Sequence, residues 1–344
     1  MISLPDTDSP KVTTYYAFNN RIMGRRRLYF LLKLFVVGYI YTIMTIAFIH
    51  NGKAFLPEID AYLSFFKGFP AISAKVIPQP GRLKINADVE WHFMGAQLKR
   101  SSNAVVIHEY ASASVPPFAA FKDMVKRYMN CSPDYRIFYS EYVRDRFNFR
   151  DGIACGLRGH GVLCKPPGLK NDAGKEYDFI YTGNTDGIRS LDSLLDCFTT
   201  GRLGDLTLLV LSKGYQKLSA RFSKYTNIQF KGPVPYAEVY SYIARSAYAI
   251  NFMPDIAPFN HQVSAKFLDY AACGVPVISS GYRWIKEFER QYGGRYFYLE
   301  PDLSNFTWEN ITSFDYSGPM LEEWTWEKQI RRSGIVAFLQ QRFP

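Results

Sequence analysis

Residues 258–280 read PFNHQVSAKFLDYAACGVPVISS, a pattern that predicts a loop, a short helix, a tight turn and a buried strand. Ser264 is suited to cap the helix, because its hydroxyl can accept a hydrogen bond from a first-turn amide. Apolar residues recur around it at helical spacing: Val263, Phe267, Tyr270 and Ala271. Gly274 is expected to end the helix, and residues 275–279 form the apolar run that is typical of strands inside parallel sheets.

Lys266 is electrostatically unfavourable where this pattern places it, because a cation in the first turn opposes the helix dipole. The conflict disappears if the helix N-terminus binds an anion such as a diphosphate. Asp269, one turn later, adds an acceptor for ligand hydroxyls. Ser264, Lys266 and Asp269 are therefore predicted to bind a ligand that carries a diphosphate and hydroxyls. The alternative is an ordinary capped helix with an incidental lysine.

The same residues resemble the nucleotide-sugar-binding half of GT-B glycosyltransferases of the group 1/family 4 type. In that branch a Lys-x-x-Glu-Tyr-x-x-x-Gly-x-Pro-Val-Ile pattern recurs at the donor site, and residues 266–278 read KFLDYAACGVPVI. Asp269 replaces the usual Glu, and His261 stands where many relatives carry the first Glu of a Glu-x7-Glu pair. The resemblance implies an α/β protein of the GT-B fold, with two facing Rossmann-like domains and a C-terminal helix that crosses back.

Composition limits the classes of partner. A chain of 344 residues with 47% hydrophobic content suits one large or two medium folded domains. The net charge of +10 is accompanied by no nucleic-acid-binding signature, so no nucleic acid is expected; anionic lipid head groups or phosphorylated saccharides are the alternative partners. The five cysteines lack metal-ligand spacing and fit a reducing cytosol.

Residues 21–53 leave three interpretations open. Arg25, Arg26 and Arg27 precede an apolar stretch, and residues 34–49 carry no charge. The favoured interpretation is a helix followed by a buried strand of an α/β domain. The others are a half-inserted amphipathic helix anchored by the arginines and a spanning helix. Whether residues 28–49 belong to a core or to a membrane is left open.

Strand and helix patterns alternate along the chain, as they do in right-handed βαβ units. In the C-terminal half, strands are predicted at 177–182, 206–211, 227–232 and 248–253, and helices at 188–198 and 237–247. In the N-terminal half, strands are predicted at 12–18, 86–93, 103–108 and 135–139, and a helix at 116–129.

A stretch rich in Pro, Gly and Lys at residues 165–174 predicts the domain boundary. Residues 1–165 are expected to form an N-terminal acceptor-binding Rossmann-like domain. Residues 166–325 are expected to form the C-terminal Rossmann-like domain that binds the nucleotide-sugar donor. Residues 326–344 are expected to form a helix that packs back on the first domain. Ligands should then bind in the crevice beyond the carboxyl ends of the strands.

Three further segments match the donor half of the superfamily. Many relatives carry Gly-Arg-x(4)-Lys-Gly after a strand; here Gly183 and Asn184 stand at its start, and Arg189 takes the Lys position. Arg189 could hold a diphosphate at two points, or be a solvated helix residue. The segment FKGPVPY resembles one that contacts the nucleotide base, so that its last residue, Tyr236, either flanks the base or starts the next helix. Lys213, after a strand, is either a donor contact or a turn residue.

Glycosyl transfer needs positive charge for the departing phosphate, which Lys266 and Arg189 could supply. An inverting enzyme also needs a base that takes the acceptor's proton. His108 and Glu109 are predicted to fill that role, because two ionisable residues follow an apolar strand and relatives place a functional His in this loop. A structural His108 packed against Tyr110 is the alternative. No metal and no cofactor are expected apart from the nucleotide diphosphate sugar.

The resemblance implies a metal-independent glycosyltransferase that moves a hexosyl or related sugar from a nucleotide diphosphate sugar to a saccharide or lipid-linked acceptor. The expected context is bacterial-type surface polysaccharide or glycolipid synthesis. The expected location is the cytoplasm, with peripheral contact to anionic lipid on the inner face of the cell membrane. A GT-B nucleotide-sugar epimerase is one alternative. A catalytically silent sugar-nucleotide-binding or membrane scaffold protein is the other.

Overall fold

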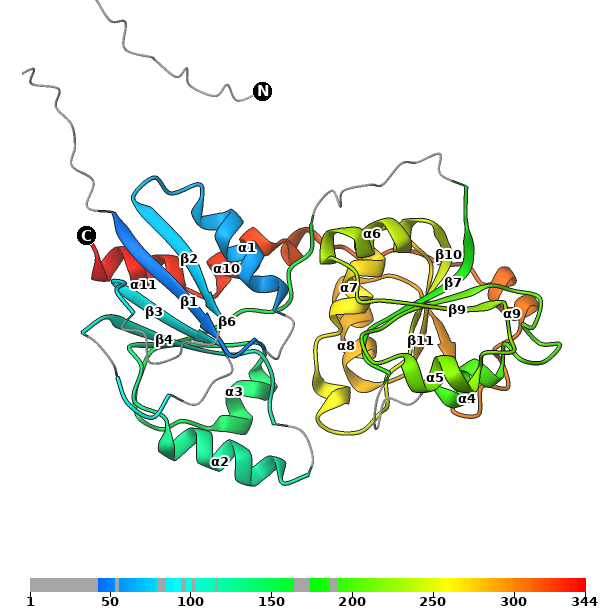
Figure 1. Cartoon of the computed structure of the whole chain (residues 1–344), viewed down its shortest axis with the longest axis horizontal. Helices are drawn as coiled ribbons and strands as arrows, with labels where there is room; N and C mark the ends of the chain where they lie inside the picture. The colour runs from blue at the N-terminus through cyan, green and yellow to red at the C-terminus, as the bar shows by residue number, and fades with distance from the viewer. Residues whose placement is uncertain are drawn as a thin grey trace, which may run out of the picture. The chain divides into compact units, whose positions relative to one another are not determined.

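Two six-stranded parallel sheets organise the chain (Figure 1). The computed structural model describes residues 43–52, 56–78, 85–93, 97–100, 103–114, 117–163, 174–185 and 191–344, all within one unit, Thr42–Pro344. Four predictions lie outside these residues: the strand at 12–18, the Arg25–Arg27 cluster, Arg189, and residues 165–173 of the proposed boundary. None of the described helices is both long enough and apolar enough to cross a membrane.

The first sheet has the strand order β2-β1-β3-β4-β5-β6, with every neighbouring pair parallel. Its strands are β1 Met44–His50, β2 Ile72–Pro78, β3 Val89–Phe93, β4 Val105–Tyr110, β5 Tyr135–Phe138 and β6 Cys155–Leu157. Its helices are α1 Pro57–Phe66, α2 Ala119–Met129 and α3 Glu141–Phe147. The predicted strands at 86–93, 103–108 and 135–139 and the predicted helix at 116–129 are confirmed. The favoured interpretation of 21–53 is confirmed in its strand, because β1 lies buried between β2 and β3.

Side-chain alternation along these strands gives the sheet two different faces. One face is apolar and aromatic and packs against α1, where the ring centroids of Tyr62 and Trp91 are 4.5 Å apart. The opposite face packs Tyr110 and Phe138 against Val143 and Phe147 of α3. This second face also carries ionisable side chains of the strands.

The second sheet has the order β12-β11-β10-β7-β8-β9, again with every neighbouring pair parallel. Its strands are β7 Tyr177–Thr182, β8 Leu208–Leu211, β9 Ile228–Lys231, β10 Ser246–Asn251, β11 Val277–Ser280 and β12 Phe297–Leu299. Its helices are α4 Asp192–Asp196, α5 Gln216–Arg221, α6 Tyr236–Ala244, α7 Ala265–Ala272, α8 Arg283–Tyr292 and α9 Trp308–Ser313. This is the doubly wound Rossmann order, in which the direction of winding reverses between β7 and β10 and leaves a ligand-binding crevice there.

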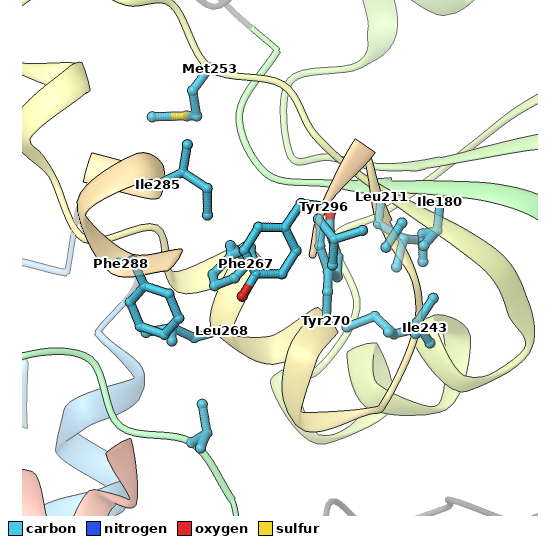
Figure 2. Packing of buried hydrophobic residues seen from close by; sticks show 14 of the residues in the cluster. Ile180, Leu211, Ile243, Met253, Phe267, Leu268, Tyr270, Ile285, Phe288 and Tyr296 are labelled. Atoms are coloured by element: carbon cyan, nitrogen blue, oxygen red, sulfur yellow. The ribbon is translucent and has the colours of Figure 1, made fainter. Parts of the chain in front are cut away.

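Helices cover both faces of the second sheet: α6, α7 and α8 lie on one face, and α4, α5 and α9 on the other (Figure 1). Phe267 of α7 is fully buried in the first of these layers, among the residues drawn in Figure 2. Its ring centroid lies 5.1 Å from that of Phe288 and 5.0 Å from that of Tyr296. The apolar stripe predicted for residues 263–271 therefore faces the core.

The C-terminal segment returns to the first sheet as two helices, α10 Trp326–Arg332 and α11 Ile335–Arg342. Ile330, Ile335 and Leu339 join the core on the α1 side of that sheet. The hydroxyl of Tyr135 donates a hydrogen bond to the carbonyl of Ser333 over 2.7 Å. The predicted crossing back of the C-terminus is thus confirmed.

The crossing depends on close approach to Gly156 of β6, which gives a stability test. A Cβ at Gly156 would overlap the carbonyl oxygen of Ser333, and this oxygen is backbone. Overpacking of this kind typically costs about 1–3 kcal/mol, so Gly156→Ala should lower the melting temperature measured by circular dichroism. Gly318→Ala is the matched control, because a Cβ there meets no heavy atom within 4 Å. Equal melting temperatures for the two variants would contradict this packing.

Candidate functional site

A cavity of about 420 Å³ lies at the carboxyl ends of strands from both sheets. The second sheet lines it with residues at and just after the end of β7, after β10 and in the first half of α7: Tyr181, Thr182, Gly183, Asn184, Met253, Gln262, Val263, Ser264, Ala265, Lys266 and Asp269, together with Tyr236 of α6. The first sheet lines it with residues that follow β1, β4, β5 and β6: Leu56, Pro57, Glu58, Ala111, Ser112, Tyr139 and His160. The cavity therefore includes the crevice between β7 and β10.

Ser264 caps α7 and also ties its first turn to the sheet. Its hydroxyl accepts a hydrogen bond from the Phe267 amide over 3.4 Å, as predicted, and donates one to Oδ1 of Asn251 over 2.9 Å. Asn251, fully buried at the end of β10, donates to the hydroxyls of Ser279 and Tyr282 over 2.9 and 3.1 Å. This buried polar network fixes the N-terminus of α7 beside β10 and β11.

Tyr270 ties the same helix to β7. Its hydroxyl accepts a hydrogen bond from the Thr182 amide over 2.7 Å and lies 3.0 Å from the Thr182 hydroxyl oxygen. Burial raises the pKa of Tyr270 well above its ordinary value, so the phenol stays protonated. α7 is therefore held on both sides of the crevice.

Lys266 points its charge back towards the strand ends. Its Nζ donates a hydrogen bond to the carbonyl of Phe252 over 2.8 Å and lies 4.2 Å from the centroid of the Tyr181 ring. Gly183, which also lines the cavity, has a φ of 126°, a backbone conformation that favours glycine. A cation, a helix N-terminus and a glycine turn thus meet at one end of the cavity, which is the arrangement that binds phosphate groups.

Asp269 is the acceptor of a buried cluster. Its Oδ1 accepts hydrogen bonds from the hydroxyls of Tyr236 and Tyr240, each over 2.8 Å, and lies 3.5 Å from Nε2 of His160. Burial, and then the charge of Asp269, raises the pKa of Tyr236 and of Tyr240 far above the ordinary value, so both phenols remain donors. The cluster joins α6 and α7 to the segment that follows β6.

His160 and Glu58 line the cavity but were not predicted from the sequence. His160 is 3% exposed, and its ring packs against Trp326 of α10 with centroids 5.0 Å apart. The sequence Gly159-His-Gly161 contains a sign of this position, because glycines allow another segment to approach closely. A Cβ at Gly161 would overlap Trp326. Two glycines around a histidine therefore mark the place where the C-terminal segment presses against the site.

A buried ion-pair network lies behind Glu58. The guanidinium of Arg158 donates from Nε to Glu109 over 2.7 Å and from Nη2 to Glu58 over 3.3 Å. Burial lowers the pKa of Arg158, but the carboxylates of Glu109 and Glu58 raise it, and the net shift is upward, so the guanidinium stays charged. Arg158 thereby fixes the carboxylate of Glu58 at the cavity wall.

The structure does not bring His108 and Glu109 to the cavity. Both lie inside β4, which continues to Tyr110, so they are not loop residues beyond a strand end and their side chains point to opposite faces of the sheet. His108 Nε2 lies 2.8 Å from Oε1 of Gln97, and Glu109 accepts a hydrogen bond from Trp91 Nε1 over 2.8 Å. Burial, followed by the nearby charges of His92, Arg136 and Arg100, lowers the pKa of His108 to about 3.

Most of the predicted donor-binding residues line the cavity, but not all of them do. Six of the predicted donor contacts line the cavity together: Gly183, Asn184, Tyr236, Ser264, Lys266 and Asp269. Lys213 is exposed and does not line it. His261, at the position of the missing Glu, stacks on Tyr142 of α3 with ring centroids 4.5 Å apart and an interplanar angle of 4°.

Comparison with known proteins agrees with this architecture. Residues 193–298 match the model of a family described as glycosyl transferase-like, and this range covers β8 to β11 and most of the cavity wall that the second sheet provides. Among curated proteins, none matches the sequence significantly.

Several solved structures share the fold at low sequence identity. Sucrose-phosphate synthase from Thermosynechococcus elongatus superposes with a TM-score of 0.58 at 13% identity, over 87% of this chain and 99% of that one. HepE from Anabaena, solved in complex with UDP-glucose, gives 0.56 at 11% identity, over 87% and 98%. UDP-GlcNAc 2-epimerase from Methanocaldococcus jannaschii, solved with UDP-GlcNAc and UDP, gives 0.53 at 11% identity, over 86% and 100%. The chain therefore has the GT-B glycosyltransferase fold, and the predicted fold class is confirmed.

The environment of His108 gives a test of stability against pH. The folded protein resists protonation of this side chain down to about pH 3, whereas the unfolded chain takes up the proton near the ordinary pKa of 6.5. The unfolded state then binds more protons, so stability falls as the pH drops below 6.5. Between pH 7 and pH 5 the free energy of unfolding, measured with urea, should fall by about 2 kcal/mol more in the parent than in His108→Gln. Equal losses in both proteins would contradict a neutral His108.

Proposed function

We propose that this protein transfers a sugar from a nucleotide diphosphate sugar to the hydroxyl of an acceptor. The observation that carries the proposal is the N-terminus of α7, where Ser264 and Lys266 face the β7–β10 crevice and Asp269 lies one turn further on. The glycosyl transferase-like match over residues 193–298 and the shared fold with HepE, solved with UDP-glucose, support it.

The donor would bind through its diphosphate. The first-turn amides of α7, the backbone at Gly183 and Asn184, and Nζ of Lys266 provide donors and positive charge for the phosphate oxygens. Oδ1 of Asp269 already accepts hydrogen bonds from Tyr236 and Tyr240. We therefore assign Oδ2 as the oxygen that accepts a hydrogen bond from a hydroxyl of the nucleotide sugar. In this proposal Lys266, not a metal ion, neutralises the leaving group.

His160 replaces His108 and Glu109 as the proposed proton acceptor. It lies on the first-sheet side of the cavity, 3.5 Å from Oδ1 of Asp269, and imidazole side chains are the most common general bases in enzymes. The acceptor oxygen would form a bond to the anomeric carbon while its proton passes to His160. The bond from that carbon to the phosphate oxygen breaks, and the diphosphate leaves with the electron pair.

The acceptor that we propose is a saccharide or a lipid-linked hydroxyl compound in surface polysaccharide or glycolipid synthesis, as the family resemblance implies. Nucleotide-sugar epimerisation is the second candidate function, since UDP-GlcNAc 2-epimerase shares the fold. Incubation with a nucleotide sugar, with and without an acceptor, distinguishes the two functions. An epimerase isomerises the sugar, whereas a transferase releases nucleoside diphosphate in an acceptor-dependent way.

Lys266→Ala tests the donor site. Loss of the ammonium should weaken binding of UDP or GDP, or lower turnover, by at least about tenfold, which corresponds to about 1.4 kcal/mol. Binding is followed as the ligand-induced rise in melting temperature, because a ligand that binds only the native state stabilises it. Lys217→Ala, an exposed lysine of α5, is the matched control. Equal nucleotide binding and turnover in Lys266→Ala and the parent would exclude this role.

His160→Gln tests the proton acceptor. Turnover should fall by about 10²- to 10⁴-fold, while the stabilisation by nucleotide should change little because the other sheet holds the donor. His108→Gln, which removes a histidine outside the cavity, should keep turnover close to that of the parent. If His108→Gln lost most of its turnover while His160→Gln kept full turnover, His108 of β4 would be the better candidate for the proton acceptor. Retention of the donor's anomeric configuration in the product would exclude an inverting reaction that uses His160 in this way.

A further inference from the structure

The helix α2 presents its apolar side chains outward. Five of the exposed large apolar residues in the described part of the chain fall within 118–129: Phe118 (77% exposed), Phe121 (60%), Met124 (45%), Tyr128 (73%) and Met129 (55%). Phe121, Met124 and Tyr128 follow i, i+3, i+7 spacing, which puts them on one stripe of the helix. A stripe of this kind normally faces a core, yet the buried residue of α2 is Asp123.

Asp123 explains the reversed orientation. One of its carboxylate oxygens accepts a hydrogen bond from the Ser114 amide over 3.0 Å, and the other accepts one from Nε of Arg146, on α3, over 3.0 Å. These polar contacts dock α2 through its charged side on α3, which it accompanies in Figure 1. The aromatic residues are consequently left on the outside.

Of the basic residues of α2, Lys122 is exposed, whereas Lys126 and Arg127 are half-buried beside α3. Nζ of Lys126 lies 5.8 Å from the centroid of the Phe147 ring, and Arg127 donates a hydrogen bond to the carbonyl of Arg146 over 3.4 Å. At the C-terminal end of α2 the amide of Gln97 donates to Oδ1 of Asn130 over 3.0 Å, which brings exposed Leu98 and Lys99 beside it. An outward aromatic stripe bordered by the exposed lysines Lys122 and Lys99 suits a helix that lies in the head-group region of an anionic bilayer.

The backbone before α2 supports a function for this surface. Phe118, the N-cap residue, has a φ of 62°, a left-handed conformation that is uncommon outside glycine. Strained backbone tends to persist where it has a role, and here it carries an aromatic side chain that is 77% exposed, next to the stripe.

We propose that α2 is the surface through which this protein binds anionic membranes. Phe118, Phe121 and Tyr128 lie among the head groups and upper acyl chains, and the exposed ammonium groups of Lys122 and Lys99 meet lipid phosphates. The α2 surface lies close to the cavity along the chain. Ala111 and Ser112 line the cavity, and two residues later the amide of Ser114 donates a hydrogen bond to Asp123 of α2. A lipid-anchored acceptor would thus be presented near the rim of the cavity. This consequence rests on the proposed function, whereas the proposal of membrane binding does not depend on it.

Flotation of the full-length protein with vesicles tests the proposal without any donor or acceptor. Vesicles of phosphatidylcholine with about 30% phosphatidylglycerol should carry the parent upward, whereas pure phosphatidylcholine should carry little, because basic residues are attracted to anionic lipid. Phe121→Ser/Tyr128→Ser should reduce the bound fraction about tenfold. Lys99→Gln/Lys122→Gln should also lower the bound fraction and weaken its dependence on salt.

Two controls make the result specific. Met320→Ser removes an equally exposed apolar residue (61%) from a different part of the chain and should float like the parent. Arg25→Gln/Arg26→Gln/Arg27→Gln removes the other basic cluster. The proposal is overturned if the parent does not float, if the α2 variants float as well as the parent, or if only the Arg25–Arg27 variant fails. It is also overturned if the α2 variants, with unchanged flotation, convert a dimer to a monomer in light scattering, since α2 would then bind a second copy.

Discussion

The candidate site depends on the position of one eight-residue helix, α7, relative to the two strands on either side of the crevice. Tyr270 holds the helix to the end of β7 through the Thr182 amide, and Ser264 holds its first turn to Asn251 at the end of β10. Both contacts are buried, where an unsatisfied donor or acceptor would cost about 1–3 kcal/mol. The register of α7 against the sheet is therefore strongly determined, and with it the positions of Lys266 and Asp269, which could not line the same cavity if the helix slid by one turn.

Asp269 extends this constraint from the second sheet to the first. A buried carboxylate is tolerated only when donors surround it, and here the hydroxyls of Tyr236 and Tyr240 on α6 provide them. Nε2 of His160, from the segment after β6, lies 3.5 Å from the same carboxylate oxygen. His160 is held in turn by Trp326 of the returning C-terminal segment. A second buried network, built on Arg158, fixes Glu58 from the other side. The cavity wall is thus rigid because its polar groups are needed to satisfy one another, a property that suits a site which must hold a reactive sugar in one orientation.

The sequence predicted what local chemistry determines. The cap at Ser264, the apolar stripe of α7, and the alternation of strand and helix are short-range features, and the structure confirms them. The position of His160, which we propose as the proton acceptor, was not predictable in the same way. His108 and Glu109 looked like residues beyond a strand, but the extent of β4 is set by its pairing with β3 and β5, which continues to Tyr110. Glu58 reaches the site through a partner 100 residues away, and no local pattern reveals such a contact.

The orientation of α2 is a second feature that its local sequence pattern does not determine. Its hydrophobic spacing taken alone predicts a helix whose aromatic stripe packs inward, because burial of apolar area is the dominant stabilising term in folding. The structure reverses it, since Asp123 meets both an amide and the Arg146 guanidinium on the inner side. A fold that places an acid inside and three aromatic rings in solvent gives up hydrophobic stabilisation that an inward stripe would provide. That loss is recovered only when an apolar phase covers the rings, so the orientation of α2 is best understood as that of a helix adapted to a surface outside the chain.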